Sequence, residues 1–172
     1  MPTSRKPAHG AAVFPVLMAD MISQTVAPAG SWSKATSRCE LSYEDRFLRR
    51  KVVQTEDGNK LLVDLAQTTS INHGDAFALE DGRFVEVVAA KEPLLEVTGD
   101  LVRLAWHIGN RHTPCQIEAD RLLIQDDPVI AHMLEHLGAT VTPASEPFAP
   151  EGGAYGHGRT HSHAHGNTAH DH

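Results

Sequence analysis

The pattern of hydrophobic and polar positions divides the chain into a strand-rich stretch, a mixed stretch and two polar ends. From residue 22 to about residue 90, short apolar runs alternate with turns typical of hairpins, such as Glu56-Asp57-Gly58-Asn59. Strands are predicted at 39–43, 49–54, 60–65, 76–79 and 84–88. Short strands at this spacing predict a small sandwich or barrel.

The pattern changes near residue 91, where strands and helices begin to alternate. Strands are predicted at 94–97, 116–119, 122–124 and 139–142. A first helix follows a cap at Thr98 or Asp100 and is predicted to end at Gly109. Its apolar stripe is Leu101, Leu104, Ala105 and Ile108. A second helix starts at 126–128 and ends at Gly138. Its predicted inward residues are Val129, Ile130, Met133, Leu134 and Leu137.

The order strand–helix–strand–strand–helix–strand is that of a ferredoxin-like domain. We therefore predict an α+β protein, with an all-β domain at 21–90 and a ferredoxin-like βαββαβ domain at 91–148. Residues 1–20 are predicted to be a disordered N-terminal extension and 149–172 a disordered, histidine-rich tail. Met21 opens a better strand pattern than the preceding residues, which makes it an alternative translation start.

Composition narrows the class of protein. The net charge of −7 argues against nucleic-acid binding, and the one basic triplet, at 49–51, is expected to be a solvated strand. An apolar run at 11–19 imitates a short signal peptide, but Pro15 and Asp20 interrupt it. No apolar stretch is long enough to span a membrane, and Cys39 and Cys115 form no CxxC. We expect a cytoplasmic protein with reduced thiols.

Six histidines fall in the last sixteen residues of the chain. They are His157, His161, His163, His165, His170 and His172. Neutral imidazole is the commonest protein ligand for late transition metals, so this tract is predicted to collect metal ions. An expression tag is usually an uninterrupted histidine run, whereas this tract is interleaved with Gly, Ser, Thr, Ala and Asp. An inert tail is the remaining alternative.

Other histidines lie in the mixed stretch. His107 is on the last turn of the first predicted helix and His112 lies just past it. A lone histidine is more often structural than a ligand. His132 and His136, four residues apart on the second helix, have a spacing able to chelate a metal on one face, but we favour ordinary surface histidines. Cys115 follows His112 by three residues, so a Cys–His nucleophilic pair is a further alternative. No H-E-x-x-H pattern supports a zinc hydrolase.

The segment Gly109-Asn110-Arg111-His112, followed by Pro114 and Gln116, resembles the GNRH-x-P-x-Q signature of the UreE-type urease accessory nickel metallochaperones. Further segments resemble the same family. They are 42–46 with 49–51, 80–87, 133–139 and 151–156 before the histidine-rich end.

The resemblance implies a β peptide-binding domain, a ferredoxin-like metal-binding domain and a homodimer through the second domain. The histidine that closes the motif, here His112, would share one Ni(II) with its symmetry mate. A ligand role for His107 is implied less firmly. Some relatives carry a second, peripheral histidine cluster, but residues 124–128 contain no histidine. Secondary binding is therefore expected from the tail.

The hypothesis is a nickel-delivery protein, not an enzyme, that acts with apo-urease and urease accessory proteins including a GTPase. Zn(II) and Cu(II) are expected to compete for the same imidazoles. Three alternatives stay open. They are a nickel or zinc buffer without a delivery partner, a hydrolase or redox enzyme using His112 and Cys115, and a metal-independent folding chaperone.

Overall fold

The structure is a computed structural model that describes residues 19–154 and residue 159. Nearly all of the predicted N-terminal extension therefore lies outside the described residues. The same is true of His157, His161, His163, His165, His170 and His172.

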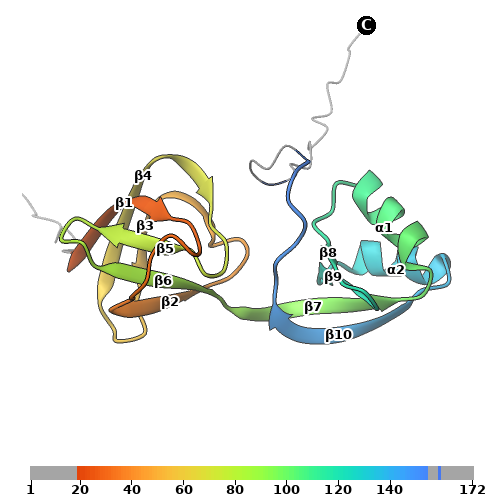
Figure 1. Ribbon diagram of the computed structural model, residues 1–172. Coiled ribbons are helices and arrows are strands. Elements are labelled where there is room, and N and C mark those ends of the chain that lie inside the picture. The colour runs from red at the N-terminus through yellow and green to blue at the C-terminus, as the bar shows by residue number, and fades with distance from the viewer. Residues whose placement is uncertain (1–18, 155–158, 160–172) are drawn as a thin grey trace, which may run out of the picture.

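The first half of the chain forms one six-stranded sheet (Figure 1). Its strands are β1 (Met21–Ala27), β2 (Ser37–Leu41), β3 (Phe47–Gln54), β4 (Lys60–Ser70), β5 (Ala76–Leu79) and β6 (Phe84–Ala89). The order across the sheet is β2-β6-β5-β1-β4-β3, with β1–β4 and β2–β6 parallel and the other pairs antiparallel. The predicted strands are all found, and they form a single curled sheet instead of two packed sheets.

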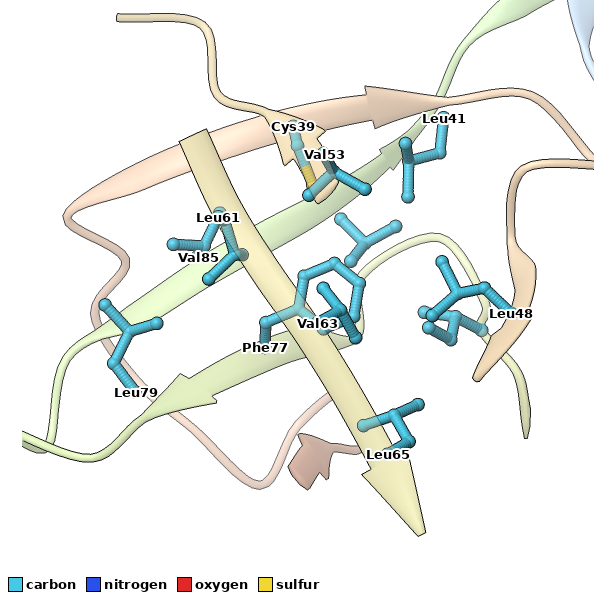
Figure 2. Packing of buried hydrophobic residues seen from close by; sticks show 12 residues of the cluster. Cys39, Leu41, Leu48, Val53, Leu61, Val63, Leu65, Phe77, Leu79 and Val85 are labelled. Carbon is cyan, nitrogen blue, oxygen red and sulfur yellow. The ribbon is translucent and has the colours of Figure 1, made fainter. Parts of the chain in front are cut away.

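The sheet curls around its own apolar core because alternate residues of each strand point inward. In β6 every second residue is buried, from Val85 to Ala89. Phe77 is fully buried and lies among aliphatic side chains from several strands (Figure 2). The predicted solvated triplet, residues 49–51, is exposed on the edge strand β3.

The second half contains a four-stranded sheet and two helices. Its elements are β7 (Lys91–Thr98), α1 (Leu101–Asn110), β8 (Gln116–Ile117), β9 (Leu122–Gln125), α2 (Pro128–His136) and β10 (Thr140–Pro147). The strand order is β10-β7-β9-β8 and every neighbouring pair is antiparallel. Both helices cover the same face of this sheet (Figure 1), and Leu104, Ile108, Ile130 and Leu134 form the core between the layers. The chain is thus α+β, as predicted.

Two predictions for the helices are wrong. Gly109 does not end α1, because it lies inside the helix, which continues to Asn110. Val129 does not face inward, since it is 71% exposed, whereas Ile130 and Leu134 are buried as predicted. The N-terminal signals are confirmed: Asp100 caps α1, and Asp127 caps α2 with Pro128 directly after it.

A buried arginine joins the two halves. Arg46 is 3% exposed and donates hydrogen bonds to the carbonyl oxygens of Ile71 (3.2 Å), Leu41 (2.9 Å) and Phe148. Phe148 directly follows β10, and its fully buried ring meets the ring of Tyr43 edge-on at 5.3 Å between centroids. One guanidinium therefore satisfies backbone groups from both halves of the molecule.

Replacing Arg46 with leucine should lower the free energy of unfolding by about 3 kcal/mol, because buried carbonyl groups lose their donors. Urea denaturation measures this difference. The control is Arg49→Leu, an exposed position on β3, for which we expect a change within about 0.5 kcal/mol. Equal stability of the two variants would contradict this account of the junction.

Candidate metal centre

His112 occupies the left-handed position of the turn that ends α1. Its φ is 55°, and it is the only described non-glycine residue with a positive φ. Two backbone bonds close the turn: His112 N–H donates to Gly109 (2.9 Å) and Thr113 N–H donates to Ile108 (3.3 Å). This pair of bonds defines a Schellman motif, in which the left-handed residue is usually glycine.

The second helix shows the usual form of the same motif. At the end of α2, Gly138 N–H donates to Glu135 (3.0 Å) and Ala139 N–H donates to Leu134 (3.0 Å). Gly138 has a φ of 90°. The two helices therefore end alike, one on glycine and one on histidine. Because an L-residue pays a steric cost in the left-handed region, the histidine at 112 points to a requirement for its side chain.

The other described candidate ligands do not form a cluster. His112 is exposed, His107 is half-buried with its ring edge-on to Trp106 at 5.0 Å, and His132 and His136 are exposed on α2. Across residues 19–154 and residue 159, no group of three or more His, Cys, Asp or Glu side chains is placed to hold a metal ion. A site at His112 therefore needs ligands from beyond the described part of one chain.

His73, in the first half, is not suited to bind metal. Its Nδ1 accepts a hydrogen bond from the N–H of Ala89 (3.1 Å). The proton of the neutral ring must then lie on Nε2, which leaves neither nitrogen with a free lone pair.

The structure does not support a nucleophilic role for Cys115. Burial raises the pKa of its thiol to about 11, with a smaller contribution from Glu151. The thiolate, which is the reactive form, is therefore scarce at neutral pH. Burial likewise raises the pKa of Cys39 to about 12.

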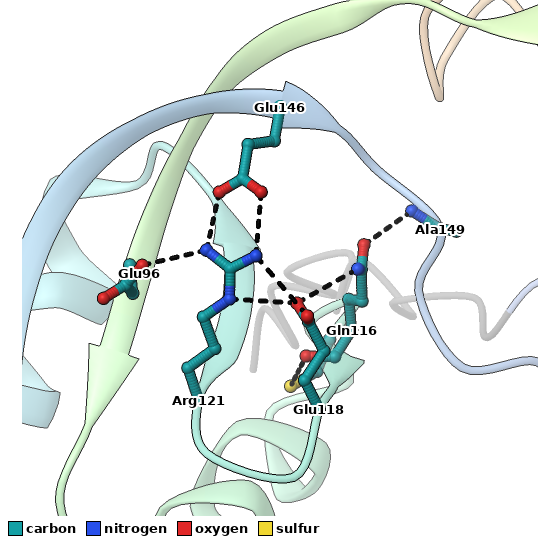
Figure 3. Close-up of polar contacts among 7 residues, drawn as sticks. Glu96, Gln116, Glu118, Arg121, Glu146 and Ala149 are labelled. Carbon is teal, nitrogen blue, oxygen red and sulfur yellow. Dashed lines mark hydrogen bonds and ion pairs between the residues drawn. The ribbon is translucent and has the colours of Figure 1, made fainter.

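A polar network supports the strand that follows His112 (Figure 3). Arg121 donates to Glu146 (2.6 and 2.7 Å) and to Glu96 (2.9 Å), and it pairs with Glu118 at 3.1 Å. These hydrogen bonds hold the pKa of Glu146 below its usual value. The amide of Gln116 extends the network by donating to Glu118 (3.3 Å). The short strand β8 is thereby tied to β7 and β10 at the surface of the sheet.

Gln116 also fixes the chain that leads into the tail. Its side-chain oxygen accepts a hydrogen bond from Ala149 N–H (2.9 Å), and Glu151 N–H donates to the carbonyl of Cys115 (2.8 Å). Residues 149–151 therefore run beside the segment that follows His112. Sequence reasoning included Gln116 in a signature but assigned it no role, because a bond across 33 positions leaves no periodic trace.

An apolar surface lies on α1 before the His112 turn. Val102 is 85% exposed and Trp106 is 63% exposed, and they are one helical turn apart. Gly109 follows on the same side of the helix, and the space beside it is open. Gly109, which was predicted to stop the helix, instead lies inside α1 on the side that carries Val102 and Trp106.

These features define a two-part α+β protein with one exposed, left-handed histidine next to the anchored root of its tail. Family models match both parts. The model described as UreE urease accessory protein, N-terminal domain, matches residues 20–90, and the C-terminal domain model matches residues 87–172. The chain belongs to the UreE family of urease accessory proteins.

Individual relatives agree with the family models. A urease accessory protein UreE from Ruegeria pomeroyi is 68% identical over 137 residues, which is 79% of this chain and 92% of that protein. The UreE of Rhodobacter capsulatus is 60% identical over 82% of this chain and 90% of its own length. The UreE of Mesorhizobium japonicum is 46% identical over 80% of this chain and 72% of its own length.

Replacing His112 with glycine should raise the free energy of unfolding by about 0.5–1 kcal/mol, because glycine adopts the left-handed conformation without a steric cost. The matched variant is Gly138→Ala at the end of α2. A Cβ there meets open space. We therefore expect Gly138→Ala to lower the free energy of unfolding by about 1 kcal/mol through backbone strain alone. Thermal or urea unfolding measures both. If neither variant shifts stability in these directions, the strain argument for His112 fails.

Proposed function

We propose that this protein is a nickel-binding metallochaperone that delivers Ni(II) for assembly of the urease metallocentre and is not itself an enzyme. The observation that carries the proposal is the exposed imidazole of His112 at a helix end where α2 has glycine. A strained residue with a metal-binding side chain favours a functional role over a structural one. The family to which the chain belongs supports urease as the target.

We propose that the metal site forms between two copies of the chain. One imidazole cannot hold a divalent ion with useful affinity, and the described residues supply no further cluster around it. In a homodimer with two-fold symmetry, each copy would contribute the same histidine to one ion. The exposed side chains of Val102 and Trp106, on the helix that carries the His112 turn, support an interface on this side of α1.

The tail would supply the remaining ligands. Its six histidines follow residues 149–151, which are bonded to the strand next to His112. Tethering raises the local concentration of imidazole near the dimer site without any new contact. His107 stays a less certain ligand. Zn(II) and Cu(II) would compete, because imidazole binds Cu(II) more tightly than Ni(II). Selectivity would then rest on metal supply and on docking with partners.

The domain assignments are also part of the proposal. The βαββαβ order and the antiparallel strand order β10-β7-β9-β8 support a ferredoxin-like metal-binding module. The six-stranded sheet would be the peptide-binding module that docks apo-urease and its accessory proteins, including a GTPase. Neither described helix has the length and hydropathy to cross a membrane.

The His112→Ala variant should lose the tightest nickel site while keeping weaker sites in the tail. Isothermal titration with Ni(II) on both proteins measures this. In the wild type, nickel binding should also fall as the pH drops through about 6, because protons compete for the imidazole lone pairs. Retention of the tightest site in the variant would move it to His132, His136 or the tail.

The alternative with most in its favour is a nickel or zinc buffer without a delivery partner, since a histidine tail serves storage equally well. Deleting residues 157–172 separates the two functions. A chaperone should lose capacity yet keep one nickel ion per dimer and much of its activation of urease. A buffer should lose nearly all bound metal. The measurements are nickel content after dialysis and urease activity in an activation assay.

A further inference from the structure

One residue beyond the first tail histidine is described, and it contacts the first half of the molecule. The guanidinium carbon of Arg159 lies 3.6 Å from the ring centroid of Tyr43 and 4.9 Å from that of Phe47. Both distances are within the range of cation–π attraction, which is strongest for partly desolvated pairs. Tyr43 lies between β2 and β3, and Phe47 is the first residue of β3.

Hydrogen bonds fix the same guanidinium. Its Nε donates to the hydroxyl of Ser70 (3.3 Å), and one Nη donates to the carbonyl of Tyr43. The charges of Glu44 and Glu92 favour the cation and oppose the cost of its partial burial. Arg159 thus combines stacking with directed bonds, a combination that the planar guanidinium allows and a lysine would not.

Arg159 lines a cavity of about 470 Å³ at the junction of the two halves. One wall comes from Tyr43, Arg46 and residues 70–73, and the other from residues 149–152. The tail root therefore has two attachments. Ala149 and Glu151 are bonded to Gln116 and Cys115, and eight positions after Glu151 the chain is held again by Arg159.

We propose that Arg159 is a latch that docks the root of the tail on the surface formed by Tyr43, Phe47 and Ser70. The latch divides the tail histidines into two groups. In the sequence His157 precedes Arg159, and the remaining five histidines follow it. Those five then start from a fixed point at the junction, and their reach is set by thirteen residues instead of the twenty-one that follow Glu151.

The effect of the latch on nickel supply rests on the proposed function, whereas the docking of Arg159 does not depend on it. Trypsin cleaves after arginine only when the side chain is free to enter the protease. We therefore compare, in the presence of a chelator, cleavage after Arg159 in the full chain and in a synthetic peptide of residues 153–166. The peptide has the same bond and no docking surface. We expect cleavage in the protein to be about tenfold slower, as a docked cation–π pair of ordinary strength would give.

Variants of the docking surface complete the test. Tyr43→Leu should bring cleavage close to the rate of the peptide, whereas Tyr43→Phe keeps the aromatic face and should stay protected. Because Tyr43 also packs on Phe148, Phe47→Leu, at a more exposed position, provides a second disruption that leaves the fold intact. Equal cleavage of wild type and peptide, or no acceleration in Phe47→Leu, would overturn the latch.

A nickel measurement separates this proposal from the previous one. Arg159→Ala retains every histidine, so the amount of nickel bound at saturation should equal that of the wild type. If the protease test contradicts the latch, the result expected for the nickel titration of His112→Ala does not change. Retention of the tightest nickel site in His112→Ala, together with intact protection of Arg159 in the wild type, would refute the metal assignment and keep the latch.

Discussion

The arrangement of the two halves depends on the hydrogen bonds that the guanidinium of Arg46 donates. It is buried where the curled sheet ends and the second sheet begins, and it donates to carbonyl groups on both sides. The ring of its neighbour Tyr43 contacts both Phe148 and Arg159, and the backbone N–H of Tyr43 donates to Glu92. The path of the chain after β10 is set by this junction.

The path set at the junction brings together the two parts of the candidate metal centre. Residues 149–151 leave Phe148 and bind beside the segment that begins at His112. The histidine itself is presented by a helix end, a rigid support compared with a loop. The backbone of the His112 turn and the root of the tail are therefore both held in place by hydrogen bonds, although residues 149–151 lie 37 to 39 positions after His112 in the sequence.

Periodicity located the strands and both helices because alternation and helical spacing are local properties of a sequence. It failed where tertiary context decides. Gly109 was assigned as a helix stop because glycine favours that position, yet the left-handed residue is His112, at a position where glycine is the usual residue. The extension of β10 to Pro147 depends on pairing with β7, and the weak pattern of TPASEP does not reveal it. Nothing in the sequence distinguishes Arg46 from other charged residues, because its hydrogen-bond partners are brought together only by folding.

The candidate site was predictable in part for the same reason. The motif that ends in His112 is contiguous and is visible in the sequence, whereas Gln116, Arg121 and Glu146 become partners only through folding. A functional motif whose residues are contiguous can be found from the sequence. A hydrogen-bond network whose residues come from several strands cannot be found in this way.

Burial of both cysteines has a consequence for how tightly any cargo could be held. Neither thiol is exposed, and burial keeps each protonated at neutral pH. The described residues therefore offer no exposed thiolate as a metal ligand. Burial also protects the two thiols from oxidation, since thiolate character and exposure decide which cysteines react. If the protein carries Ni(II) as proposed, an ion held only by nitrogen and oxygen donors would be released by ligand exchange, without any change of redox state.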